Sequence, residues 1–117
     1  MKKLNCLVVD NERAYLKLIG DYIRFTSFLE LKGKCSTVSD AMQIIADHQI
    51  DLVFLNIHMT DLNNKDFSKI LKGGPRIILT TSMPAYAFIG FRGNALDCLI
   101  KPIVYEKFLR ASSKALI

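Results

Sequence analysis

The order of hydrophobic and polar residues predicts short strands that alternate with helices along the whole chain. Most apolar runs have the length of a strand and are followed by apolar residues at three- and four-residue spacing. The expected strands are residues 4–9, 29–35, 51–56, 77–81 and 95–100. The expected helices are one after Glu12, one that begins at Ser39 or Asp40, and residues 64–72, 85–91 and 105–116.

Two features of this pattern indicate how the elements pack. Residues 51–56 are apolar throughout their middle, as in a parallel strand covered on both faces, whereas residues 29–35 alternate apolar and charged positions, as in a strand near a sheet edge. The first helix carries one apolar stripe, made of Tyr15, Leu18, Ile19, Tyr22 and Ile23. Five strands and five helices joined by short connections predict an α/β fold, an open parallel sheet with helices on both sides.

The composition limits the classes of function. The chain has 117 residues, half of them hydrophobic, which predicts one domain over residues 1–117. The net charge of +5 is spread without a dense basic run, so we expect no direct binding of nucleic acid by this domain. No apolar run is long enough to cross a bilayer and the N-terminus does not resemble a signal peptide. Three widely spaced cysteines predict free thiols, so we expect a cytoplasmic protein with no membrane contact.

Polar residues end four of the expected strands. Asp10 and Asn11 follow the first strand, Asn56 ends the third, Thr81 ends the fourth and Lys101 follows the fifth. In open parallel sheets the ligand crevice lies at the carboxyl ends of the strands, so these side chains are expected at one rim. The sequence lacks a glycine-rich phosphate loop and a credible nucleophile–histidine set, so we expect no catalytic residues and no enzyme activity.

Four segments make the pattern specific. Residues 7–12, 52–59, 78–82 and 97–102 resemble, in order and spacing, the signature blocks of response-regulator receiver domains, the phosphorelay modules of bacterial two-component systems. The resemblance covers the whole chain and implies a flavodoxin-like (βα)5 sheet with strand order 2-1-3-4-5. Residues 86–91 and 95–102 are most similar to receivers that precede a LytTR-type DNA-binding domain, which implies a role in transcription regulation through a separate effector domain.

The resemblance also assigns roles to single residues. Asp10 matches the first acidic residue, Thr81 the switch hydroxyl, and Lys101 with Pro102 the phosphate-contacting lysine and its cis proline. Three positions depart from the family. Asn56 stands at the phospho-acceptor aspartate, Asn11 at the second acidic residue that holds Mg²⁺, and Cys98 at the usual Tyr or Phe.

These departures predict a pseudo-receiver that is not phosphorylated. A neutral amide is no nucleophile for phosphoryl transfer, and Mg²⁺ prefers charged oxygen ligands, of which only Asp10 and Glu12 remain. We therefore expect no cofactor and no metal site, with Mg²⁺ binding lost or weak. Lys101, which would contact a phosphoryl group, is expected to pair with Asp10 instead.

The expected activity is binding to a protein partner or a second copy, through the fourth helix, the fifth strand and the fifth helix, which form the output face in the family. A sensor kinase or an effector domain is a possible partner. Aromatic and arginine side chains suit such a face, whereas Phe108 is expected in the core. The candidate interface residues are Tyr86, Phe88, Phe91, Arg92, Tyr105 and Arg110.

Two alternatives stay open at the level of sequence. One is an ordinary phosphorylatable receiver of a LytTR-type regulator, in which Asn56 replaces a natural aspartate. The other is a flavodoxin-like module that senses a small molecule in the crevice vacated by phosphate and metal.

Overall fold

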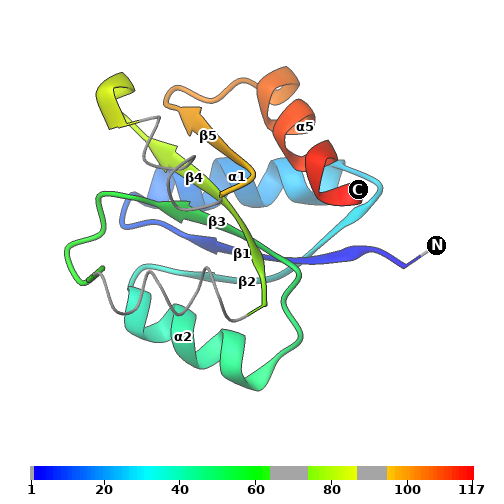
Figure 1. Cartoon of the computed structure of the whole chain (residues 1–117), viewed down its shortest axis with the longest axis horizontal. Coiled ribbons are helices and arrows are strands. Elements are labelled where there is room, and N and C mark those ends of the chain that lie inside the picture. The colour runs from blue at the N-terminus through cyan, green and yellow to red at the C-terminus, as the bar shows by residue number, and fades with distance from the viewer. Residues whose placement is uncertain (1, 64–73, 87–94) are drawn as a thin grey trace.

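The computed structural model describes residues 2–63, 74–86 and 95–117, which form one parallel sheet with helices on both faces (Figure 1). The strand order is β2-β1-β3-β4-β5, and every neighbouring pair is parallel. This confirms the predicted order 2-1-3-4-5 and the place of residues 29–35 at an edge. The strands are β1 (Leu4–Val9), β2 (Leu29–Cys35), β3 (Leu52–Asn56), β4 (Arg76–Thr81) and β5 (Asp97–Ile100).

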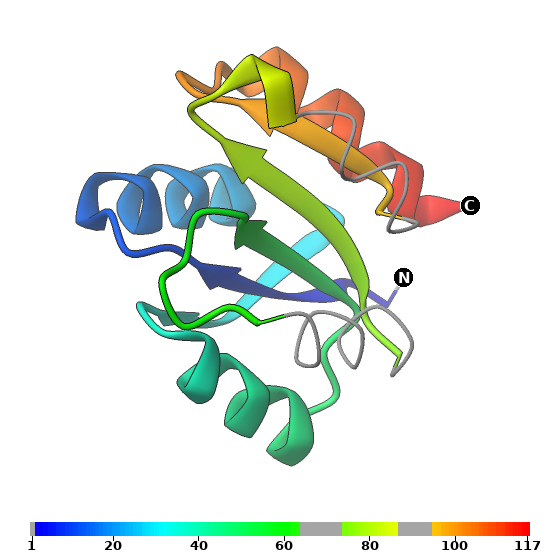
Figure 2. The same ribbon diagram turned by 60° about the vertical axis from the view of Figure 1, so that its left-hand side comes forward.

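The helices lie in two layers, one on each side of the sheet (Figure 2). Helices α1 (Arg13–Phe25) and α5 (Tyr105–Ser113) cover one face, and α2 (Val38–Asp47) covers the other. Two short 3-10 turns, η1 (Pro84–Tyr86) and η2 (Lys114–Leu116), follow β4 and α5. No helix within the described residues is both long enough and apolar enough to span a membrane.

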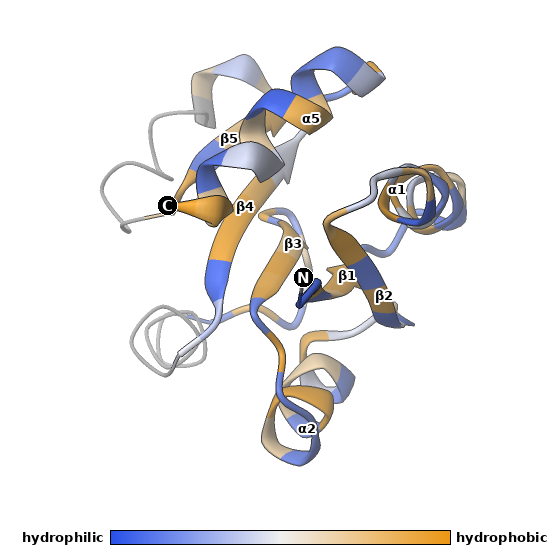
Figure 3. Cartoon of the chain, turned by 90° about the vertical axis from the view of Figure 1, so that its right-hand side faces the viewer, coloured by the Kyte–Doolittle hydropathy of each residue, from blue (hydrophilic) through white to orange (hydrophobic). Residues whose placement is uncertain are grey.

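The core is two-sided because successive residues of a strand point to opposite faces. In β1, Cys6 and Val8 pack into the cluster under α1 and α5, whereas Leu7 and Val9 pack into the cluster under α2. The central strand β3 is buried at all five positions, so its side chains are apolar until the final Asn56. Figure 3 shows the strands as a hydrophobic centre between helices whose outer faces are polar.

Helix α1 confirms the predicted apolar stripe at Tyr15, Ile19, Tyr22 and Ile23, but Leu16 packs against the described core in place of Leu18. Ile19 and Ile23 are buried, and Tyr22 is half-buried between α1 and α5. The Tyr22 hydroxyl donates a hydrogen bond to the Ile103 carbonyl over 2.9 Å, so the polar end of this stripe residue is satisfied. This hydrogen bond attaches the connection before α5 to α1.

Helix α2 begins earlier than predicted. The predicted start at Ser39 or Asp40 was wrong, because Thr37 is the N-cap and its Oγ1 accepts a hydrogen bond from the Asp40 amide over 3.1 Å. The Asp61 carboxylate accepts two further hydrogen bonds from the Val38 amide, at 3.0 and 2.9 Å. A distant acidic residue therefore completes the cap, which local sequence does not reveal.

Other boundaries differ less. The fifth strand begins at Asp97 and not at residue 95, and the closing helix changes to a 3-10 turn after Ser113. The predicted helix over residues 64–72 lies outside the described residues. Of the helix predicted over residues 85–91, only Ala85 and Tyr86 are described, and they belong to η1.

Phe108 lies in the core, as expected from the sequence. Its side chain is fully buried and stacks on Phe54 with ring centroids 5.0 Å apart. Phe108→Ala should lower the free energy of unfolding by about 3–5 kcal/mol in chemical denaturation, through lost burial and a cavity. Phe25→Ala is the matched control, because Phe25 is 79% exposed and its loss should cost under about 1 kcal/mol. Similar losses for both variants would contradict this core.

Candidate functional site

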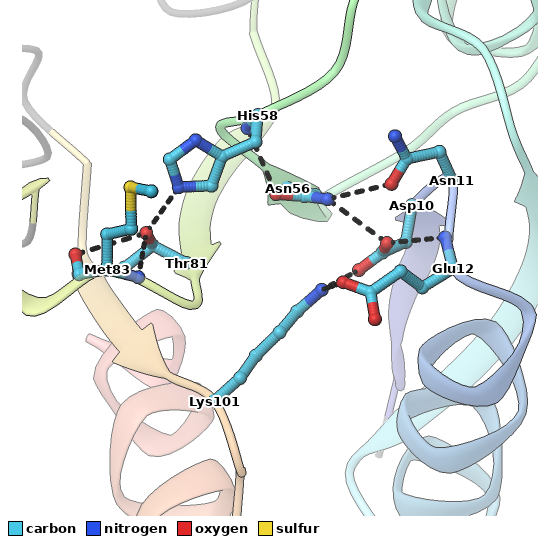
Figure 4. A network of polar contacts seen from close by, with 8 residues as sticks. All are labelled: Asp10, Asn11, Glu12, Asn56, His58, Thr81, Met83 and Lys101. Atoms are coloured by element: carbon cyan, nitrogen blue, oxygen red, sulfur yellow. Dashed lines mark hydrogen bonds and ion pairs between the residues drawn. The ribbon is translucent and has the colours of Figure 1, made fainter.

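The carboxyl ends of β1, β3, β4 and β5 meet at one rim of the sheet, as the sequence predicts, and carry a connected polar network (Figure 4). Asn56 and Lys101 each contact Asp10 directly, and Thr81 is connected to Asn56 through His58. The Lys101-Pro102 peptide bond is cis, as the resemblance implies.

Asp10 is the centre of the network and is only 1% exposed. One carboxylate oxygen accepts hydrogen bonds from the Glu12 amide over 2.9 Å and from the Asn56 side-chain amide over 3.1 Å. The other oxygen forms an ion pair with the Lys101 ammonium over 3.0 Å. The predicted pairing of Lys101 with Asp10 is confirmed, and it compensates a carboxylate that would otherwise be buried without a counter-charge.

Lys101 has two partners that the sequence did not predict. Its ammonium is 2.8 Å from the Glu12 carboxylate and lies over the Tyr15 ring, 4.1 Å from the ring centroid. The lysine side chain is only 5% exposed, whereas that of Glu12 is 54% exposed. The buried cation therefore has two carboxylates and an aromatic face around it, and its charge is balanced within the chain.

Asn56 acts as a donor toward the acidic loop. Its side-chain nitrogen donates to Asp10 over 3.1 Å and to the Asn11 side-chain oxygen over 3.2 Å. Its side-chain oxygen accepts a hydrogen bond from the His58 amide over 3.0 Å. A carboxylate at this position has no hydrogen to donate and would face the Asp10 carboxylate, so the amide suits the present contacts.

His58 connects this pocket to the end of β4. Its Nε2 lies 2.6 Å from the Thr81 hydroxyl, which also accepts a hydrogen bond from the Met83 amide over 3.0 Å and donates to the Met83 carbonyl over 3.2 Å. The Thr81 hydroxyl, at the family's switch position, thus has hydrogen-bond partners in both His58 and Met83. His58 was not among the site residues expected from the sequence; the available signal was its place two residues after Asn56.

Cys98 occupies the position where the family usually has a large aromatic residue. The side chain is half-buried and packs beside the cluster under α2. Burial raises the pKa of the Cys98 thiol to about 11, and that of Cys35 to about 11 and of Cys6 to about 12. All three cysteines are free thiols and stay protonated at neutral pH, so they behave as small apolar side chains.

The predicted interface residues are only partly described. Tyr105 is half-buried, with its ring 5.2 Å from Tyr22 and 5.3 Å from Phe25 between centroids, so much of it packs within the protein. Arg110 is exposed on α5. Phe88, Phe91, Arg92 and the Tyr86 side chain lie outside what the structure describes.

No group of three or more His, Cys, Asp or Glu side chains is arranged to hold a metal ion in residues 2–63, 74–86 and 95–117. At the rim, Asp10 is already bound to Lys101, and the neighbouring positions carry the neutral amides Asn11 and Asn56. The two rim carboxylates, Asp10 and Glu12, both pair with Lys101, whereas a hard cation needs several charged oxygens that are free to bind it. The donor set therefore does not fit Mg²⁺ well.

Comparison with known structures gives the same fold. The response regulatory domain of protein mrkE from Klebsiella pneumoniae superposes with a TM-score of 0.85 at 20% identity, covering 97% of this chain and 95% of that one. CheY in the CheX-CheY-BeF3-Mg²⁺ complex from Borrelia burgdorferi also has a TM-score of 0.85, at 18% identity, covering 99% of this chain and 91% of that one.

Comparison of sequences identifies the family. The sensory transduction protein LytT of Enterococcus faecalis is 33% identical over 119 residues, which cover 96% of this chain and 48% of that protein. The chain thus spans about half the length of the curated relatives it matches. A family model described as the response regulator receiver domain matches residues 6–112. The chain therefore belongs to the response regulator receiver domains of two-component signalling, with LytT-type relatives.

Proposed function

We propose that this chain is a pseudo-receiver, which signals by binding proteins and is not switched by aspartyl phosphorylation. The observation that carries the proposal is Asn56, whose amide stands where the family has its phospho-accepting aspartate and donates to Asp10 and Asn11. Phosphoryl transfer needs an ionised oxygen nucleophile, and an amide is neutral, with its nitrogen lone pair delocalised. The module accordingly has no catalytic activity of its own.

The electrostatics of the pocket support the same conclusion. In a phosphorylatable receiver, Mg²⁺ and the lysine offset the negative charge of the carboxylates and the phosphoryl group. Here Lys101 is balanced by Asp10 and Glu12 at 3.0 and 2.8 Å, without any added ion. A phosphoryl group entering this pocket would displace those contacts and would find few ligands for an accompanying cation.

The output is proposed to be a protein contact through the predicted fourth helix, most of which lies outside the described residues, together with β5 and α5. Arg110 of α5 is exposed, and so are two apolar side chains, Ile100 at the end of β5 and Val104 at the N-cap of α5. A protein partner or a second copy would occupy this face, with a sensor kinase or an effector domain as candidates. Support comes from the Borrelia burgdorferi CheY, which was crystallised in a complex with CheX.

Regulation of transcription would require a separate effector domain. LytT-type relatives are about twice as long as this chain, so such a domain is part of the proposal. A cytoplasmic location is proposed as well, because three free thiols suit a reducing compartment.

Removing the two amides should destabilise the protein in the absence of Mg²⁺. The double variant Asn11→Asp, Asn56→Asp places carboxylates against Asp10 and deletes the two hydrogen bonds from the Asn56 nitrogen. We expect the free energy of unfolding to fall by about 1–2 kcal/mol in EDTA. Gln49→Glu, an exposed amide-to-carboxylate change outside the pocket, controls for added charge. Equal stability of the double variant and the parent protein would refute the repulsion argument.

The proposal itself is tested by incubation with Mg²⁺ and a small phosphoryl donor, or with beryllofluoride. The parent protein should show no mass increase and no backbone NMR shift at Asn56, Thr81 or Lys101. The double variant Asn11→Asp, Asn56→Asp is the positive control, because it keeps Asp10, Thr81 and Lys101 and should regain the response. An acid-labile phosphate on the parent chain would overturn the proposed function.

A further inference from the structure

A groove of about 720 Å³ lies next to the Asn56 pocket, on the other side of Asn11. The start of α1, the end of β2 and the first turns of α2 enclose it, and α1 and α2 lie on opposite faces of the sheet (Figure 1). The volume is in the range of small-molecule sites, roughly 300–1,000 Å³. All of its lining residues belong to the described chain.

The rim of this groove carries opposite charges on its two sides. Arg13 of α1 and Lys34 of β2 provide the positive side, and Asp40 of α2 provides the negative side. Among the described residues, the salt bridges involve other side chains, so none of these three charges has an ion-pair partner. Three unpaired charges around one groove are available to a ligand.

The N-terminus of α2 does not offer free amides to a negatively charged group of a ligand. Its first amides, those of Val38 and Ser39, already bind the Asp61 carboxylate at 2.9 to 3.2 Å. Arg13 and Lys34 are therefore the groups left to bind an anion. Between the charged sides, Leu16 and Ile44 line the groove with apolar surface.

We propose that the groove binds a short zwitterionic peptide of two or three residues. Its carboxylate would contact Arg13 and Lys34, its ammonium would contact Asp40, and an apolar side chain would pack on Leu16 and Ile44. Arg13 and Asp40 lie on helices that cover opposite faces of the sheet, and Lys34 lies on β2, so the ligand would reach across the end of β2. A single amino acid carries both charges on one carbon, whereas three extended residues span about 10 Å.

Asn11 connects this groove to the pocket of the preceding proposal. It lines the groove, and its side-chain oxygen accepts the hydrogen bond from Asn56 over 3.2 Å. A bound peptide would touch Asn11 and so change the surroundings of Asn56. The groove would provide an input that needs no phosphoryl transfer, although binding there does not depend on the loss of phosphorylation.

The test is an NMR titration of the ¹⁵N-labelled chain with the tripeptide Ala-Leu-Ala. Backbone amides of Arg13, Lys34 and Asp40 and the side-chain amide of Asn56 should shift together with one dissociation constant. Blocking either end of the peptide, by N-acetylation or C-terminal amidation, should weaken binding about tenfold or more, since each block removes a charge-assisted contact. Absence of shifts, or equal binding of the blocked peptides, would overturn the proposal.

Variants separate this groove from unspecific charge effects. Arg13→Gln, Lys34→Gln and Asp40→Asn should each weaken Ala-Leu-Ala by about tenfold, because each removes one ligand charge partner. Lys107→Gln and Glu106→Gln remove exposed charges on α5 and should leave the dissociation constant unchanged. Equal weakening by the control variants, or none by the groove variants, would also overturn the proposal. Phosphorylation of the parent chain would overturn the proposed pseudo-receiver function but would not change peptide binding in the groove. The two proposals can therefore fail separately.

Discussion

The buried ion pair between Lys101 and Asp10 is the interaction on which the functional rim depends. Both side chains are almost fully buried, at 5% and 1% exposure, and neither charge could remain there alone. Glu12 adds a second carboxylate to the lysine, and the Asn56 amide donates to the remaining oxygen of Asp10. The charge of the buried lysine is thus compensated by carboxylates of the chain itself, without an added ion.

The network extends beyond the ion pair. Asn56 positions the His58 amide, and the His58 ring contacts the Thr81 hydroxyl, which is also bound to Met83. The His58 ring, from the loop after β3, therefore binds the Thr81 hydroxyl, which stands at the family's switch position. The proposed function rests on these contacts together: the first acidic residue, the hydroxyl and the lysine of a receiver are present, but side chains of this chain already bind them.

Much of the fold could be predicted from the sequence, because each strand is a short run in which apolar residues are either continuous or alternate with polar ones. The bounds of β1 and β2 agree with the prediction, since Asp10 and Ser36 end their patterns sharply. The start of α2 could not be predicted, because half of its cap is supplied by Asp61, 23 residues away from Val38. Local patterns carry no information on such a distant partner.

The candidate site was predictable to a similar extent. The meeting of Asp10, Asn56 and Lys101 follows from strand order, and their positions follow from the family resemblance. The contacts of Glu12 and Tyr15 with Lys101, and of His58 with Thr81, depend on side-chain conformations that sequence does not determine. The groove beside Asn11 depends on how α1 and α2 flank the end of β2, which again appears only in three dimensions.

The most direct measurement of the central claim is calorimetric titration of the chain with Mg²⁺. A pocket whose carboxylate is already neutralised by Lys101 should give no binding heat at Mg²⁺ concentrations that saturate an intact acidic site. Tight, stoichiometric binding of Mg²⁺ that disappears in Asp10→Asn would show that the rim still holds its metal, and would contradict the account.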